Sequence, residues 1–165
     1  MNRETIEILV NKAIELLVEN EPQLLELNVT ERALSHHLAR YLGELVPKDF
    51  NVDCEYNRHF DYPKRLNLKR RQAKDRAIHT TTVSPDIIVH KRDSNTDNLL
   101  VIEMKKPGEN LQYDETKLLA FRKELGYIHA QPTSSSASET VNSSKRFSGL
   151  MANFSCNKTW VLLAV

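Results

Sequence analysis

Three charged side chains stand in two apolar segments, at positions where a buried strand does not normally carry charge. Asp86 lies near the start of S-P-D-I-I-V-H (84–90), and Glu103 and Lys105 lie near the end of L-L-V-I-E-M-K-K (99–106). Two converging carboxylates repel each other unless a positive group lies between them. That group is either Lys105, in a salt bridge, or a hard divalent cation such as Mg²⁺, which prefers oxygen ligands. Buried ion pairs are often no more stabilising than apolar residues, which favours the cation.

The two segments have the pattern of an antiparallel hairpin around a polar connector, K-R-D-S-N-T-D-N (91–98). If Asp86 lies opposite Glu103, the numbers of paired residues sum to 189, and the turn centres on Ser94 and Asn95, a turn-prone dipeptide. Because side chains alternate along a strand, Glu103 and Lys105 share one face. The apolar residues between and before them take the other face: Leu100, Ile102 and Met104.

Helical spacing of apolar residues predicts one helix over 3–19, ended by Pro22, and a second helix capped by Asn28 or Thr30. Glu31 lies on the apolar stripe of the second helix, three residues before Leu34. Its carboxylate is either part of a capping box or a ligand of a site. The helix alone favours the capping role.

A basic segment follows a predicted strand at 50–57 and is expected to be a long loop or a short irregular helix. It holds eight cations against Asp61 and Asp75: Arg58, Lys64, Arg65, Lys69, Arg70, Arg71, Lys74 and Arg76. This density of positive charge is the usual footprint of a protein that binds phosphate backbones. A solvated run of charge is the alternative.

Beyond the hairpin, a helix is predicted over 114–125, with Leu118, Phe121 and Leu125 on one side. Lys117 on this helix could reach the charged residues of the hairpin. We also expect a short strand at 126–130, a flexible Ser/Thr-rich loop at 131–148 and a last strand at 159–165.

The composition is that of an ordinary globular protein, with 165 residues, 40% hydrophobic and 27% charged residues and a net charge of +1. A single domain spanning 1–165 is expected. No apolar run is long enough to span a membrane, and the start of the chain does not have the pattern of a secretory signal. Two cysteines without metal-like spacing agree with a reducing compartment, so the expected localisation is cytoplasmic.

The order of these motifs resembles the PD-(D/E)XK nuclease superfamily, which has the restriction-endonuclease-like fold. Pro85-Asp86 and Glu103-Met104-Lys105 carry the resemblance, and T-E-R-A-L-S-H-H-L-A-R-Y-L, N-V-D-C-E-Y-N-R and P-D-I-I-V-H-K-R are similar to a small bacterial branch. The similarity covers roughly residues 30 to 125. It implies an α/β (α+β) fold with a central mixed β-sheet flanked by α-helices.

The resemblance also implies roles for four catalytic residues. Asp86 and Glu103 would hold Mg²⁺, with Mn²⁺ as a substitute, Lys105 would assist the attacking water, and Glu31 would complete the metal site. This reverses the preference that the helix alone gives for Glu31.

The leading hypothesis is therefore a Mg²⁺-dependent endonuclease that hydrolyses phosphodiester bonds of nucleic acid, in particular DNA. The basic segment and Lys117 would hold the backbone, and pairing with a second copy or a partner protein is expected. The alternative is a catalytically silent subunit that retains the nuclease fold and binds nucleic acid or a partner. A weaker third hypothesis is a structural protein whose charged residues form a salt-bridge network.

Overall fold

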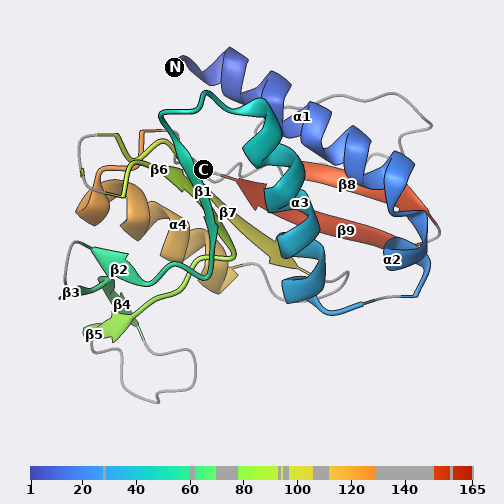
Figure 1. Ribbon diagram of the computed structural model, residues 1–165. Coiled ribbons are helices and arrows are strands. Elements are labelled where there is room, and N and C mark those ends of the chain that lie inside the picture. The colour runs from blue at the N-terminus through green and yellow to red at the C-terminus, as the bar shows by residue number, and fades with distance from the viewer. Residues whose placement is uncertain are drawn as a thin grey trace.

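The centre of the fold is an antiparallel sheet with helices on both faces (Figure 1). The computed structural model describes residues 1–27, 29–59, 62–69, 78–92, 94, 97–105, 112–128, 151–156 and 158–164. It describes the backbone alone at residues 59, 62, 69, 78, 79, 151–156 and 158–164.

In these residues the central sheet has five strands. In spatial order they are β1 (Asn51–Cys54), β6 (Ile87–His90), β7 (Leu100–Lys105), β9 (Lys158–Ala164) and β8 (Met151–Cys156). Each neighbouring pair is antiparallel. The prediction of a mixed sheet is therefore wrong for the described ladders, although a sheet flanked by helices is confirmed. The reason lies in β9, which pairs antiparallel with β7 on one side and with β8 on the other.

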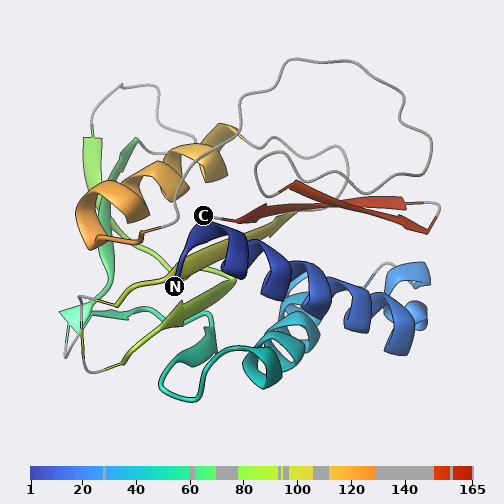
Figure 2. The ribbon, with the colours of Figure 1, turned by 90° about the horizontal axis from the view of Figure 1, so that it is seen from above.

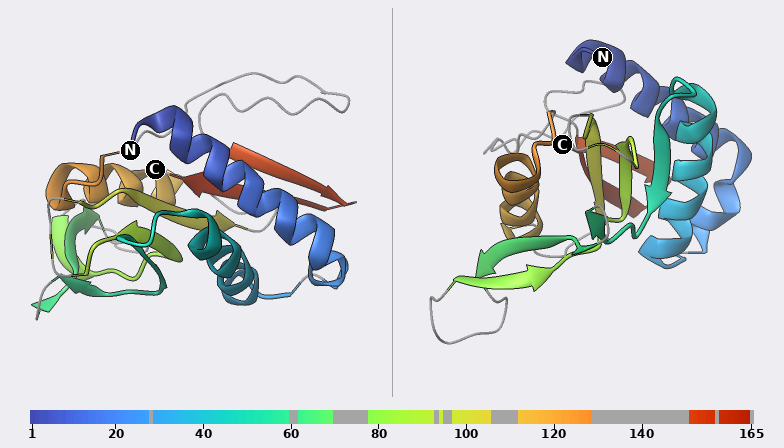
Figure 3. Two further views of the ribbon diagram at one scale, coloured as in Figure 1. Left: turned by 45° about the horizontal axis from the view of Figure 1, so that its top comes forward. Right: turned by 60° about the vertical axis from the view of Figure 1, so that its left-hand side comes forward.

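Helices cover the two faces of this sheet. They are α1 (Arg3–Asn20), α2 (Pro22–Glu26), α3 (Glu31–Leu45) and α4 (Gln112–Leu125). Figure 2 and the right panel of Figure 3 show α1 and α3 on one face and α4 on the other. The first predicted helix agrees with α1, but Pro22 begins α2, because proline is well tolerated at the first position of a helix.

The cap of α3 differs from the prediction of a capping box. The Thr30 side chain accepts a hydrogen bond from the Ala33 backbone N–H at 3.2 Å, so Thr30 is the N-cap. Glu31 is then the first helical residue and does not occupy the third position, from which a glutamate reaches back to the cap. Its carboxylate is directed to another partner, described below.

The hairpin of β6 and β7 has the predicted register. Ile87 pairs with Ile102 and Val89 with Leu100, so the residue numbers sum to 189. The predicted alternation along β7 is also confirmed. Leu100, Ile102 and Met104 belong to the core beneath α1 and α3, and Val101 belongs to the core beneath α4.

The basic segment begins as strands rather than as a loop or helix, which corrects the prediction. β2 (Arg58–His59) pairs with β3 (Tyr62–Pro63), and β4 (Arg65–Lys69) pairs with β5 (Ile78–Thr82). Leu66 and Leu68 of β4 are buried in the core beneath α4. This period of two is short, and the cations Arg65 and Lys69 at its ends obscured it in the sequence.

The β4–β5 hairpin is tied to α4 by polar contacts as well. The Asn67 side-chain amide donates to Glu124 Oε2 at 2.9 Å, and Thr80 Oγ1 donates to Asn67 Oδ1 at 2.9 Å. The right panel of Figure 3 shows the hairpin extending away from the sheet on the α4 side. Its root is therefore held by both apolar packing and hydrogen bonds.

The chain after α4 differs from the predicted strand at 126–130. Gly126 has a φ of +69°, a conformation that glycine adopts without steric cost, and it ends the helix. Residues 126–128 form no strand, and Tyr127 turns back into the core beneath α4. The predicted loop at 131–148 lies outside the described residues. The last predicted strand agrees with β9, whereas β8 was not predicted.

Among the helices of the described residues, none combines the length and the apolar character needed to cross a membrane.

Candidate active site

Six charged side chains gather where β6 and β7 meet the first turns of α3 and α4. Three were predicted on the hairpin, Asp86, Glu103 and Lys105, and Glu31 was predicted from α3. Asp114 and Lys117 come from α4. We call these six residues the charged cluster.

Asp86 is fixed by a hydrogen bond to the backbone of β7. The Met104 N–H donates to Asp86 Oδ2 at 2.7 Å, so a carboxylate takes the place of a strand carbonyl at the end of the ladder. Burial raises the pKa of Asp86, and the hydrogen bond from Met104 opposes that effect. Asp86 therefore lies directly beside the Glu103–Met104 segment, as the predicted register requires.

Glu103 is the most deeply buried acid of the charged cluster, with 2% of its surface exposed. Lys117 Nζ lies 2.7 Å from its Oε1, so the two side chains form a buried ion pair. Burial raises the pKa of Glu103, Lys117 lowers it, and the carboxylates of Asp86 and Asp114 raise it. Together these effects bring the pKa to about 8. A proton or a cation therefore stabilises this side chain near neutral pH.

Lys105 faces two other carboxylates. Its Nζ lies 3.6 Å from Glu31 Oε2 and 3.8 Å from Asp114 Oδ2, and 12% of its side chain is exposed. The first turn of α3 is held against β7 by Ser35 Oγ, which contacts Met104 Sδ at 3.1 Å and donates to the Glu31 carbonyl at 2.8 Å. The structure thus brings the predicted residue Glu31 to Lys105.

Asp114 was missed by the sequence reasoning. It is 4% exposed, and its Oδ2 has no hydrogen-bond partner. A signal was present in the sequence, because Asp114 precedes Leu118 by four residues and Phe121 by seven. It therefore continues the apolar stripe of α4 toward its start. A carboxylate on such a stripe is the pattern that singled out Glu31.

The charged cluster carries four carboxylates and two ammonium groups, a formal charge of −2 when all six are ionised. Across the described part of the chain, no three His, Cys, Asp or Glu side chains are close enough together to hold a metal ion. Two carboxylates are sufficient for Mg²⁺, which keeps several of its waters. Asp86 and Glu103 fit such an ion, because both supply hard oxygen donors and the buried Glu103 carboxylate lies in a cluster with an excess of negative charge.

The residues predicted to bind nucleic acid are found in different environments. Arg58 and Arg65 are exposed on β2 and β4. For Lys69 only the backbone is described, and the other four cations of the segment lie outside the described residues: Arg70, Arg71, Lys74 and Arg76. Lys117 lies within the charged cluster, against Glu103.

The prediction that Lys64 binds nucleic acid is corrected, because this residue is only 2% exposed and does not reach the surface. Its Nζ donates to the Tyr127 hydroxyl at 2.9 Å and lies 5.4 Å from the centre of the Tyr56 ring and 5.3 Å from that of Tyr127. Burial lowers the pKa of Lys64 to about 8. A phosphate backbone could not contact this lysine in the present arrangement.

A second polar group lies on β1 and β6. His90 Nε2 is 2.9 Å from Asp53 Oδ2, and Arg92 Nε donates to the same oxygen at 3.0 Å. Burial alone would raise the pKa of Asp53, but these hydrogen bonds hold it well below its usual range. This group is satisfied internally and lies away from the charged cluster along β6.

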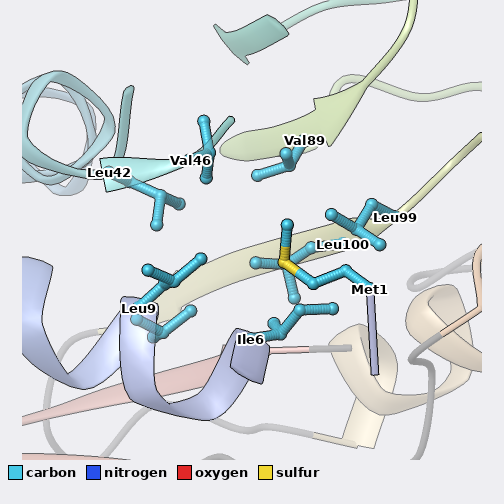
Figure 4. Close-up of a pocket in the computed structure, with 9 residues that line it drawn as sticks. Met1, Ile6, Leu9, Leu42, Val46, Val89, Leu99 and Leu100 are labelled. Carbon is cyan, nitrogen blue, oxygen red and sulfur yellow. The ribbon is translucent and has the colours of Figure 1, made fainter. Parts of the chain in front are cut away.

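An apolar hollow lies between the start of α1 and the sheet (Figure 4). Its lining includes Met1 and Ile6 of the N-terminal segment and Val89 and Leu100 of the sheet. It contains no polar side chain that could orient a ligand, so we do not assign it to the site.

Comparison of the chain with protein-family models, with curated proteins and with solved structures found no significant match.

Proposed function

We propose that the protein hydrolyses phosphodiester bonds of nucleic acid, with DNA as the substrate, in a reaction that depends on a divalent cation. The observation that carries this proposal is the buried Glu103 carboxylate beside Asp86, in a cluster whose formal charge is −2 when its six side chains are ionised. A buried acid and a partly buried acid beside two lysines are an expensive arrangement for a purely structural hairpin. They are the groups that a phosphate-cleaving site needs.

Asp86 and Glu103 would hold the ion, and Mg²⁺ would supply a polarised phosphate oxygen and a more acidic bound water. Glu31 is 3.6 Å from Lys105, so its first contribution is to hold that ammonium. Lys105 would then stabilise negative charge that develops on the phosphate in the transition state. Exposed Arg58 and Arg65 would contact the backbone of the substrate, which gives affinity without reading its sequence.

Isosteric neutral variants of the two acids test this function. Asp86→Asn and Glu103→Gln should each lower cleavage of a DNA panel in Mg²⁺ by at least about 100-fold, the range found for removal of one essential electrostatic group. Lys105→Met should have a similar effect. Circular dichroism should show an intact fold, and Glu19→Gln, an exposed acid on α1, should cleave like the parent. Unchanged cleavage in the variant that carries all three substitutions would refute the proposal.

The catalytically silent binding subunit remains a second candidate, and one observation favours it. Each acid of the charged cluster that we assign to the ion or to Lys105 already has a basic or backbone partner, and three metal-binding side chains do not converge in the described residues. This candidate predicts DNA binding that weakens steeply with salt. It also predicts neither heat of Mn²⁺ binding nor cleavage, so calorimetry together with the cleavage assay separates the two functions.

A further inference from the structure

Lys117 joins the two segments that carry the proposed ion-binding acids. Its Nζ lies 2.7 Å from Glu103 Oε1 and donates to the Ser84 carbonyl at 3.3 Å, two residues before Asp86. Only 12% of the Lys117 side chain and 3% of the Glu103 side chain are exposed. The ammonium therefore lies beside Oε1, one of the two oxygens through which Glu103 could bind a cation.

We propose that the Lys117 ammonium and a divalent cation compete for the Glu103 carboxylate, so that Lys117 weakens the binding of the ion. This inference rests on the proposed function, because it takes Asp86 and Glu103 as the residues that hold the ion. It assigns to Lys117 a role distinct from that of Lys105.

Burial explains why the ionised form of Glu103 needs a positive partner. A buried carboxylate that loses its counter-charge is strongly destabilised, so without an ion the ionised form depends on Lys117. The Lys117 ammonium brings a single positive charge to Oε1, at 2.7 Å. A divalent cation compensates the negative charges of Glu103 and Asp86 together, whereas one ammonium group compensates them less completely.

The side chain of lysine also suits exchange with an ion. Its ammonium is a point charge on a flexible four-carbon stem, so it can leave Glu103 without a movement of the α4 backbone. Lys105 cannot substitute for it, because its ammonium is held between Glu31 and Asp114. Loss of Lys117 should therefore leave ionised Glu103 without a counter-charge and raise the affinity of the site for a divalent cation.

The test uses the full chain and Mn²⁺ as the probe. Parent protein, Lys117→Met and Lys123→Met are titrated with Mn²⁺ by calorimetry and unfolded by heat with and without the ion. Lys123 is an exposed lysine on the same helix, so its variant controls for the loss of one charge from α4. We expect Lys117→Met to bind Mn²⁺ at least tenfold more tightly than the parent. It should unfold at a lower temperature without the ion and gain more from the ion than the parent does, while Lys123→Met behaves like the parent.

The outcomes distinguish this inference from the function on which it rests. Equal or weaker Mn²⁺ binding by Lys117→Met, with binding by the parent, overturns the competition and leaves the proposed function intact. No binding by either protein refutes the ion-dependent function and the competition with it. If Lys117→Met does not fold without an ion, Lys117→Gln is titrated instead. Its amide can still donate to the Ser84 carbonyl, and its affinity for Mn²⁺ is judged in the same way.

Discussion

At the scale of single residues, the molecule places two ionisable groups where water cannot reach them, with opposite consequences. Glu103 is buried among charges, and burial raises its pKa to about 8. Lys64 is buried among aromatic rings, and burial lowers its pKa to about 8. Burial shifts the pKa of each group toward its neutral form, relative to the unfolded chain. Each group therefore makes stability depend on pH.

For Glu103, stability should fall as the pH rises. The unfolded chain releases this proton near pH 4.5, whereas the folded chain retains it to about pH 8. Stability from this group is therefore present below pH 4.5 and is lost between pH 4.5 and 8. Relative to Glu103→Gln, the parent should lose on the order of 3 kcal/mol of unfolding free energy over this interval. Urea unfolding at pH 5 and pH 9 measures the difference, and a constant gap between the two proteins would argue against a proton on Glu103.

For Lys64, the pH dependence has the opposite sign. The unfolded chain holds this proton to about pH 10.5 and the folded chain to about pH 8, so stability rises between these values. Lys64→Met removes the cost of burying a charge and should raise the unfolding free energy at pH 7 by roughly 2 kcal/mol, after the loss of one hydrogen bond to Tyr127.

The control for this prediction is Lys48→Met, which removes an exposed lysine and should leave stability unchanged. A less stable Lys64→Met protein would show that the contacts of the ammonium with the Tyr56 and Tyr127 rings outweigh the cost of burial.

At the scale of elements, α4 is the part on which both the site and the nearby hairpin depend. Its apolar side contributes Leu118 and Phe121 to the core shared with β4, its first turn contributes Asp114 and Lys117 to the charged cluster, and Glu124 in its last turn binds Asn67. A shift of this helix would therefore change the positions of the lysine and the acid together.

Truncation of the largest apolar side chain of α4 tests this dependence. Phe121 is fully buried and packs edge to face against Tyr127, with ring centres 5.7 Å apart. Phe121→Ala should lower the unfolding free energy by about 3 to 5 kcal/mol, because it leaves a cavity between the helix and the sheet. Leu119 on the same helix is 47% exposed, so Leu119→Ala should cost well under 1 kcal/mol. Similar losses in the two variants in chemical denaturation would mean that α4 does not dock through this face.

At the scale of the whole molecule, the sequence predicts best what local patterns determine. The register of β6 and β7 follows from alternation and from a turn near Ser94, and Glu31 follows from a charge on an apolar helical stripe. Asp114 follows from the same rule, because it lies four residues before Leu118 on the apolar stripe of α4. Burial of Lys64 could not be foreseen, because Tyr127 meets it from a segment more than sixty residues away. The antiparallel position of β9 is also a long-range result that no local pattern specifies.

The pairing of β9 with β7 has a consequence for the order of folding. β6 and β7 join residues close in the chain, whereas the pair Lys105–Val161 joins residues 56 positions apart. Closing so long a loop costs more entropy and delays the contact, so the β6–β7 hairpin should form before β9 arrives. During that interval the backbone edge of β7 that later pairs with β9 is open to any other extended chain. The nascent protein is therefore most vulnerable to self-association at the strand on which its chemistry depends.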